Sequence, residues 1–440
     1  MDNVEEKSIE LPDNKLFSFP SKIVYHHYDN RIFVISVDTA NWLILNNEEE
    51  LAFFELLKKY QLKEALEHFS GSTESAESVL AQIIGRDFEN TKVELKSTES
   101  SLHLYLTNKC NMRCPHCYMN AGIKNNNELE KSEILLLLQG AAKHGVSHLI
   151  LSGGEIMLCA DLVEYINLAS KLGMSVELLT NGTLLTEKFI LEIKDKVNRV
   201  QVSIDGYDEI SNSKIRGKGN FIRALNAVDL LVKHSIAVDI GITPRFHDKL
   251  HEEVNNFVSF VKHISEKYKD KVTVAFTSAL FDGRDLRLTD SDREYYSECV
   301  SEITKKSFGG MNKDLGFIKF HGQHGIDENC AYGNITISST GDIYFCAQIS
   351  QMKSFGNIRE IGIDKMFEFS NKAKEKSNIN NVEPCKDCEV KYICGGDCRI
   401  KFFESLKDCT SNEMPYRLCN DKIKSSVYEQ MLRTHEYLFV

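Results

Sequence analysis

Cysteine content constrains this chain more than any other feature. Thirteen of its 440 residues are cysteine, and most of them fall into two spaced groups. The first is a Cys-x3-Cys-x2-Cys pattern, Cys110-Asn-Met-Arg-Cys114-Pro-His-Cys117, and the second is spread over residues 330–419. The acidic N-terminus lacks the basic and apolar runs of a signal peptide, so we expect a cytosolic (cytoplasmic) protein with reduced thiols. In that compartment the spacing indicates metal sites more than disulfides.

Charge and hydropathy exclude some partners. The chain has 53 Lys and Arg against 64 Asp and Glu, which gives a formal net charge of −11. A broad electrostatic interaction with nucleic acid or with an anionic membrane is therefore not expected. The apolar runs fall far below the roughly 18 residues that a transmembrane helix needs.

Hydrophobic patterning predicts three domains, at residues 1–96, 97–310 and 311–440. In the first domain, three β-prone runs precede three helical segments, an order that predicts a winged-helix-like module. The runs lie at 23–25, 32–35 and 42–45, and a third helix is expected over 75–84. The polar segment 88–101 is expected to be a linker.

The middle domain alternates strand-like and helix-like segments, which predicts an α/β fold with a parallel sheet and right-handed crossovers. Strands are expected at 102–107, 148–152, 176–180, 199–204, 237–243 and 271–277. Helices are expected between them at 131–144, 161–172, 187–197, 220–234 and 250–268. This pattern fits either a doubly wound sheet or a partial barrel, and in both the active site lies at the C-terminal strand ends.

The last domain is dense in cysteine, and its periodicity is weak. We expect little regular structure between Cys330 and Cys419, and a terminal helix over 421–437. Bound metal rather than a hydrophobic core is expected to hold this region together.

The loop 110–117 follows the first predicted strand of the middle domain. Three thiolates on a short loop can bind three irons of a [4Fe-4S] cube and leave the fourth iron open for an external ligand. A structural zinc site is the alternative, because His116 lies between two of the cysteines and could be the fourth ligand.

This loop resembles that of the radical S-adenosylmethionine (SAM) enzymes. In that family the open iron binds the amino and carboxylate groups of SAM, whose reductive cleavage yields methionine and a 5′-deoxyadenosyl radical. The resemblance implies a partial (β/α)6 barrel, and segments at the next strand ends resemble the family's SAM-binding segments. These cofactor-binding residues are Gly153, Gly154 and Glu155, then Asn181, then Ser203 and Asp205, and finally Arg216, which resembles the partner of the SAM carboxylate. Ile156 stands where the family commonly has Pro, and each short match alone could be a turn or a surface charge.

The second cysteine group is similar to the seven-cysteine signature of the SPASM domain, which carries two auxiliary iron–sulfur clusters. The family's crossed connectivity implies that one [4Fe-4S] cluster is fully ligated by Cys385, Cys388, Cys394 and Cys419. The other would receive only three ligands, from Cys330, Cys346 and Cys398. Its fourth ligand is left open among His321, His324, Cys159, Cys299, Cys409 and a substrate group. Two zinc ribbons are the alternative, since Cys-x2-Cys is a common zinc spacing.

The N-terminal module resembles the peptide-recognition domain of many maturases of ribosomally made peptides (RiPPs). In that family an exposed strand pairs with the leader of the precursor peptide, so the backbone supplies affinity and side-chain pockets supply selectivity. A winged-helix-like appendage that binds DNA is the alternative, and the net charge of −11 argues against it.

Together these resemblances imply a peptide maturase with SAM, three iron–sulfur clusters, a precursor peptide and a reductant such as flavodoxin or ferredoxin. Hydrogen abstraction from the peptide would be followed by crosslinking, with a thioether as our first expectation and a carbon–carbon bond as our second. Anaerobic sulfatase maturases share the cysteines but typically place an Asp directly after the second auxiliary-domain cysteine, where this chain has Ala347. A binding and electron-transfer protein is the alternative outside enzymes.

Overall fold

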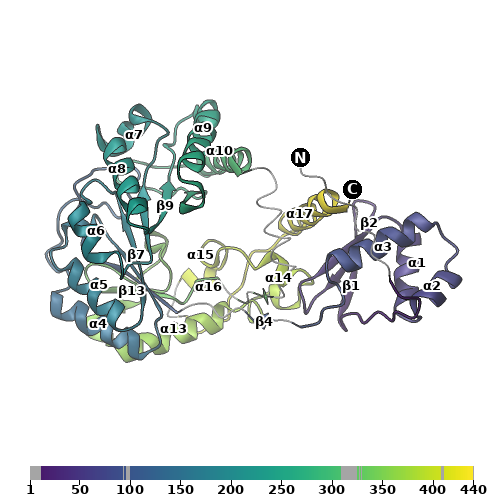
Figure 1. The fold of residues 1–440 in the computed structure, drawn as a ribbon. Coiled ribbons are helices and arrows are strands. Elements are labelled where there is room, and N and C mark those ends of the chain that lie inside the picture. The colour runs from purple at the N-terminus through teal and green to yellow at the C-terminus, as the bar shows by residue number, and fades with distance from the viewer. Residues whose placement is uncertain are drawn as a thin grey trace.

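The computed structural model describes residues 11–92, 94–95, 100–308, 325–326, 328, 330–407 and 411–439. The α/β part lies at one end of an elongated molecule, the cysteine-rich part in the middle and the N-terminal module at the other end (Figure 1). No helix among these residues is long and apolar enough to cross a membrane.

The N-terminal module is a three-stranded antiparallel sheet followed by three helices. Its elements are β1 (Ile23–Tyr28), β2 (Arg31–Ser36), β3 (Trp42–Leu45), α1 (Glu48–Leu57), α2 (Leu62–His68) and α3 (Thr73–Gly85). Asp29 and Asn30 form the β1–β2 turn with φ of 50° and 56°, a left-handed geometry that Asp and Asn tolerate. Asn47 caps α1, because its side-chain oxygen Oδ1 accepts a hydrogen bond from the Glu50 amide at 2.9 Å. These features confirm the expected order, but Phe88, expected in the linker, is fully buried in the module's core.

The middle of the chain forms a parallel sheet in the order β10-β9-β8-β7-β6-β5. The strands are β5 (Ser101–Tyr105), β6 (His148–Ser152), β7 (Ser175–Thr180), β8 (Arg199–Ser203), β9 (Ala237–Ile242) and β10 (Val272–Phe276). The helices are α4 (Lys131–Lys143), α5 (Leu162–Lys171), α6 (Glu187–Ile193), α7 (Glu209–Arg216), α8 (Asn220–Lys233), α9 (Val254–Tyr268) and α10 (Asp290–Phe308). All six predicted strands are confirmed within two residues, whereas α7 and α10 were not predicted. Among the described residues β10 pairs with β9 alone, so the sheet is open.

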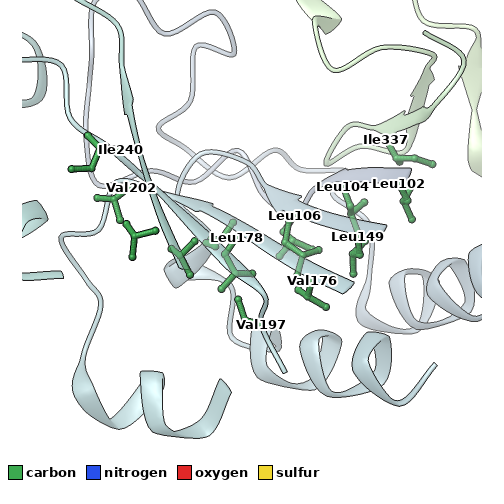
Figure 2. Close-up of a cluster of buried hydrophobic side chains, with 14 of the residues drawn as sticks. Leu102, Leu104, Leu106, Leu149, Val176, Leu178, Val197, Val202, Ile240 and Ile337 are labelled. Atoms are coloured by element: carbon green, nitrogen blue, oxygen red, sulfur yellow. The ribbon is translucent and has the colours of Figure 1, made fainter. Parts of the chain in front are cut away.

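Alternate residues of these strands form the main core. Leu102, Leu104, Leu149, Val176, Leu178 and Ile337 belong to one buried cluster (Figure 2). Burying such aliphatic side chains contributes roughly 1.5–3 kcal/mol each.

The cysteine-rich region continues this sheet. Its strands are β12 (Ile335–Ile337), β13 (Asp342–Tyr344) and β14 (Gly356–Asn357), and β12 pairs in parallel with β5 through Ile335 and Leu102. The helices are α12 (Ile358–Ile361), α13 (Ile363–Ser377), α14 (Lys391–Cys394), α15 (Arg399–Phe402), α16 (Glu404–Lys407) and α17 (Asp421–Phe439). A short parallel pair joins β4 (Glu94–Leu95) to β11 (Gly325–Ile326). The expectation of sparse regular structure was therefore wrong, because pairing with a strand more than 200 residues earlier supplies the hydrogen bonds.

Candidate functional site

The loop with Cys110, Cys114 and Cys117 begins just beyond the C-terminal end of β5. Backbone amides point at two of the sulfurs, with Met112 N 3.4 Å from Cys110 Sγ and Ala121 N 3.4 Å from Cys117 Sγ. Such amides stabilise sulfur that carries negative charge, as in a thiolate or a metal-bound thiolate.

The thiols of Cys110 and Cys114 are affected by their neighbours on the loop. Burial raises the pKa of Cys110, and it raises that of Cys114 to about 11, with Cys117 adding to both and Arg216 opposing. Within the described residues, no three His, Cys, Asp or Glu side chains are arranged to hold a single metal ion. The His116 ring, which would complete a zinc site, has its Nε2 3.4 Å from Asp205 Oδ2.

Gly153 and Gly154 follow β6 and press against the start of the cysteine loop. A Cβ on Gly154 would lie 2.4 Å from the Lys109 carbonyl oxygen, and a Cβ on Gly153 would lie 2.6 Å from that of Thr107. The Gly154 amide donates to Thr107 O at 2.7 Å, and the Glu155 amide donates to Lys109 O at 2.8 Å. Only glycine allows this approach, which fixes where the loop leaves the sheet.

Glu155 is 1% exposed and lies between the C-terminal ends of β6 and β7. Its carboxylate accepts hydrogen bonds from Thr180 Oγ1 at 2.6 Å, Asn181 N at 2.8 Å and Met157 N at 3.1 Å. Burial raises its pKa although these bonds oppose the shift. With all three bonds to neighbours on β7 and its own turn, Glu155 here positions the strand ends.

Asn181 connects the end of β7 to the cysteine loop. Its Nδ2 donates to Asn111 Oδ1 at 2.8 Å, and Asn111 Nδ2 in turn donates to Thr183 Oγ1 at 3.0 Å. Because Asn111 lies between Cys110 and Met112, these hydrogen bonds join the C-terminal end of β7 directly to the cysteine loop.

Asp205 and Arg216 form an ion pair beyond the end of β8. Asp205 Oδ2 lies 2.6 Å from Arg216 Nε and 3.4 Å from His116 Nε2. Thr243 N donates to Asp205 Oδ1 at 3.0 Å, so the carboxylate also holds the end of β9. Although burial opposes its charge, Asp205 and the Cys114 thiolate raise the pKa of Arg216. Ser203, the last residue of β8, lies at the same edge of the sheet.

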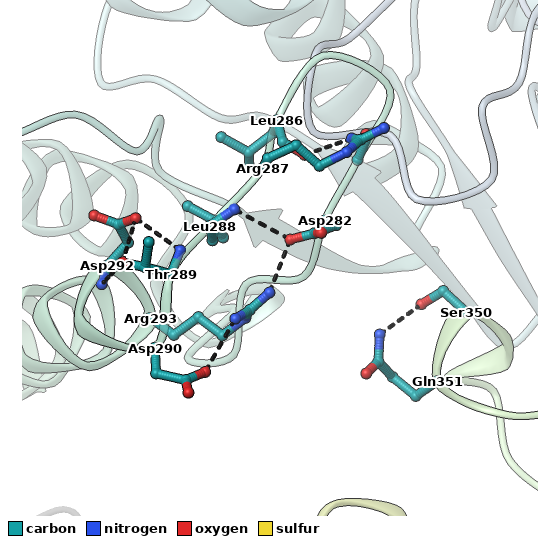
Figure 3. Close-up of polar contacts among 11 residues, drawn as sticks. Asp282, Leu286, Arg287, Leu288, Thr289, Asp290, Asp292, Arg293, Ser350 and Gln351 are labelled. Atoms are coloured by element: carbon teal, nitrogen blue, oxygen red, sulfur yellow. Dashed lines mark hydrogen bonds and ion pairs between the residues drawn. The ribbon is translucent and has the colours of Figure 1, made fainter.

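The segment after β10 supports the cysteine loop from outside. Asp285 N donates to Pro115 O at 2.8 Å and Arg284 N donates to Cys117 O at 3.1 Å. Asp282 holds this segment by accepting from Leu288 N at 3.2 Å and from Arg293 at 2.8 Å (Figure 3). The pattern of the sequence gave no signal for this support.

Tyr118 connects the cysteine loop to the cysteine-rich region. The residue is 45% exposed, and desolvation raises the pKa of its hydroxyl. Its hydroxyl lies 2.9 Å from that of Tyr105, which donates to Ala347 O at 3.0 Å. Sequence reasoning missed this connection, although Tyr118 directly follows Cys117 and Ala347 directly follows Cys346.

Four of the later cysteines surround one cavity of about 190 Å³, far larger than the roughly 30 Å³ of one water. They are the four for which the crossed connectivity implies full ligation, namely Cys385, Cys388, Cys394 and Cys419. Arg417 also lines it, with Nη1 3.5 Å from Cys394 Sγ and 3.8 Å from Cys385 Sγ. A cavity with four sulfurs and a buried cation suits an anionic iron–sulfur cluster.

A separate group is formed by Cys330, Cys346 and Cys398. Burial raises the pKa of Cys346, and the nearby thiols of Cys330 and Cys398 add to this rise. His321, His324 and Cys409 lie outside the described residues. Cys159 lies beside Asp161 at the start of α5, and Cys299 is buried in α10 beside Tyr295. The structure thus brings neither of these two spare cysteines to the group as its fourth ligand.

Comparisons with known proteins agree with this geometry. Residues 104–261 match the radical SAM superfamily, and residues 329–389 match the iron–sulfur cluster-binding SPASM domain. The chain therefore contains a radical SAM domain followed by a SPASM domain. Cys394, Cys398 and Cys419 lie beyond the matched segment.

Two relatives and one solved structure illustrate the range. The AdoMet-dependent heme synthase of Methanosarcina barkeri is 27% identical, over 71% of this chain and 94% of the relative. The PqqA peptide cyclase of Rhizobium meliloti is 24% identical, over 70% of this chain and 84% of the relative. The structure of anSMEcpe with bound AdoMet superposes with a TM-score of 0.56 at 17% identity, over 77% of this chain and 98% of that one. This last likeness confirms the fold.

Proposed function

We propose that the protein is a maturase of a ribosomally made precursor peptide, with a recognition module at 1–96, a radical SAM partial barrel at 97–310 and a SPASM domain at 311–440. The observation that carries the proposal is the meeting of Cys110, Cys114 and Cys117 with the glycine and carboxylate segments of three further strand ends. The N-terminal module, with its own core, supports a peptide as the substrate.

The residues present fit the groups that this reaction needs. Cys110, Cys114 and Cys117 would hold one [4Fe-4S] cluster, and SAM bound beside it would supply a 5′-deoxyadenosyl radical when reduced by flavodoxin or ferredoxin. Gly153, Gly154, Glu155, Asn181, Ser203, Asp205 and Arg216 would shape the SAM site. Arg216 is suited to the SAM carboxylate, because its guanidinium is desolvated and charged.

The peptide crosslink that we favour is a thioether. The 5′-deoxyadenosyl radical would take one hydrogen atom from a peptide carbon, a cysteine thiol would lose its proton as the C–S bond forms, and the remaining electron would pass to an auxiliary iron–sulfur cluster. Three cysteines rather than four in the Cys330, Cys346 and Cys398 group support this choice, since an open iron would accept a substrate thiolate. A carbon–carbon crosslink is the second choice.

Other functions have less support. Ala347 cannot act as the base that sulfatase maturases typically have at this position. The heme synthase among the relatives shows that the two domains alone do not select a substrate class, so the N-terminal module carries the choice of a peptide.

The proposal is tested with reconstituted protein, SAM and dithionite. We expect 5′-deoxyadenosine from the wild type and none from the Cys110→Ala, Cys114→Ala and Cys117→Ala variants. No 5′-deoxyadenosine from the iron-loaded wild type would favour an electron-transfer protein instead. The thioether is tested by adding a short cysteine-containing peptide from a neighbouring reading frame. It should lose two hydrogens by mass spectrometry and alter the EPR signal of the three-cysteine cluster.

A further inference from the structure

The N-terminal sheet has two buried faces, and only one is covered by the module's own helices. The other face carries Phe33, Ile35, Trp42 and Ile44, all fully buried. These residues pack against Val390, Val427, Tyr428 and Met431, with Cys388 and Cys394 partly buried in the same cluster. The module, α14 and α17 accordingly lie side by side (Figure 1). The module thus docks on the loop that supplies three of the four cavity cysteines, Cys385, Cys388 and Cys394.

Tyr428 on α17 is the centre of this docking surface. Its ring stacks on His26 of β1 at 4.2 Å between centroids and meets Phe33 of β2 edge-on at 5.4 Å. Its hydroxyl donates to Glu389 Oε1 at 2.5 Å, and Lys424 Nζ lies 3.3 Å from the same carboxylate. Because Glu389 directly follows Cys388, the side chain of Tyr428 contacts both the module's sheet and the loop from Cys385 to Cys398.

The loop from Cys385 to Cys398 has little regular structure to hold it. Between Cys385 and Cys398, its helical elements are a single 3-10 turn (Cys385–Asp387) and the four-residue α14. Helices this short are not stable alone in water. The four thiols line a cavity of about 190 Å³. A cluster bound by the four thiols would cross-link the two ends of this loop to Cys419, the residue two before α17.

We propose that the four-cysteine cluster anchors the N-terminal module, with Tyr428 and Glu389 as positioning residues, so that the module keeps its place only when the cluster is assembled. This inference rests on the proposed function for the presence of the cluster. It adds that the module's orientation depends on a site remote from the loop of Cys110. Leader-dependent modification would then need the four-cysteine cluster, whereas SAM cleavage without peptide would not.

Hydrogen exchange followed by mass spectrometry tests the anchor on the full chain. The segments to follow are residues 23–36 of the sheet and 421–439 of α17. In Cys419→Ser, which removes a thiol outside the docking cluster, we expect both segments to exchange at least tenfold faster than in the iron-loaded wild type. Cys110→Ala is the matched control, and its exchange in these segments should equal that of the wild type.

Two further variants keep all ten cysteines of the two groups. Tyr428→Ala should speed exchange in both segments at full iron content, and Tyr428→Phe, which keeps the ring but not the bond to Glu389, should fall between Ala and the wild type. Tyr25→Phe removes a hydroxyl bonded to Glu55 on the sheet's opposite side, so its α17 segment should exchange as in the wild type.

Iron content separates the two ways to fail. An iron-loaded wild type whose exchange in these segments matches that of Cys419→Ser would overturn the anchor and leave the proposed function standing. A variant with Ser at all four of Cys385, Cys388, Cys394 and Cys419 that keeps the iron content of the wild type would overturn the four-cysteine cluster itself, and the anchor with it.

Discussion

The hydroxyl groups of Tyr105 and Tyr118 lie 2.9 Å apart, which joins the first parallel strand to the residue after Cys117. Because Tyr105 donates to Ala347 O, its oxygen is left to accept from Tyr118. The two cysteine loops on either side are thereby held at a fixed separation.

Replacing Tyr105 by Phe removes both contacts of this hydroxyl. We expect a loss of about 1–2 kcal/mol in the free energy of unfolding, because two hydrogen bonds made by the hydroxyl of the buried Tyr105 are lost. Peptide modification should slow several-fold, while iron content and SAM cleavage without peptide stay as in the wild type. Tyr344→Phe is the control, since no hydrogen bond of that hydroxyl is present in the described residues. Equal rates for the two variants would contradict a positioning role for Tyr105.

Gly154→Ala should disturb the first cluster. The new Cβ would lie 2.4 Å from the Lys109 carbonyl oxygen, a contact that forces the backbone before Cys110 to move. We expect iron content to fall by about one cluster, measured by colorimetric iron analysis after reconstitution. In the control Gly122→Ala, the Cβ meets only Arg284 Nη2 at 3.8 Å, so iron content should be unchanged.

Arg216→Leu leaves Asp205 as a buried carboxylate without its cation. Loss of one partner of a buried ion pair costs about 3–5 kcal/mol, and we expect SAM binding to be lost as well. Urea unfolding and isothermal titration with SAM measure the two effects. Arg199→Leu breaks the exposed pair with Asp239 at 2.6 Å and should cost at most about 1 kcal/mol. A similar cost for both variants would argue against a buried pair.

Stability at the docking surface should fall in acid because of His435. Burial, together with the nearby charges of Arg31 and Arg86, lowers the pKa of His435 from 6.5 to about 4. Between pH 6.5 and 4 the unfolded chain therefore binds the extra proton, so this contribution is complete above pH 6.5 and is lost as the pH falls towards 4. The shift corresponds to about 3 kcal/mol.

The sole tryptophan, Trp42, reports on this region because it packs in the same docking surface. Urea unfolding followed by its fluorescence should show a smaller loss between pH 7 and 5 in His435→Leu than in the wild type. His103, whose pKa burial also lowers to about 4, should retain its own part of the slope. Identical slopes in the two proteins would contradict the assignment to His435.

Much of the fold follows from local pattern. The six parallel strands and most of their helices are visible as alternating periodicity, and Gly145 follows α4 in the left-handed conformation, with φ of +79°. Pairing of β12 with β5 could not be read in the same way, because strands of three residues carry no periodicity and choose their partner through tertiary packing. The same holds for Phe88, whose polar neighbours concealed a buried ring.

The candidate site shows the same division. The structure collects around one cavity the four cysteines that the SPASM resemblance groups together, and their role as cluster ligands stays a prediction. Glu128 was missed, although its buried carboxylate accepts from Thr107 Oγ1 at 2.9 Å and Asn108 N at 2.7 Å. A lone Glu 18 residues from the cysteine loop's start carries no sequence signal, because its partners are chosen by the fold.

The pairing of β12 with β5 has a consequence for motion. One continuous ladder of hydrogen bonds runs from β10 to β14, so the radical SAM sheet and the first SPASM strands form one rigid body without a hinge between them. The N-terminal module shares no strand with this body among the described residues. Its position relative to this body is set by the docking surface, so a peptide bound by the module would reach the strand ends in one fixed orientation.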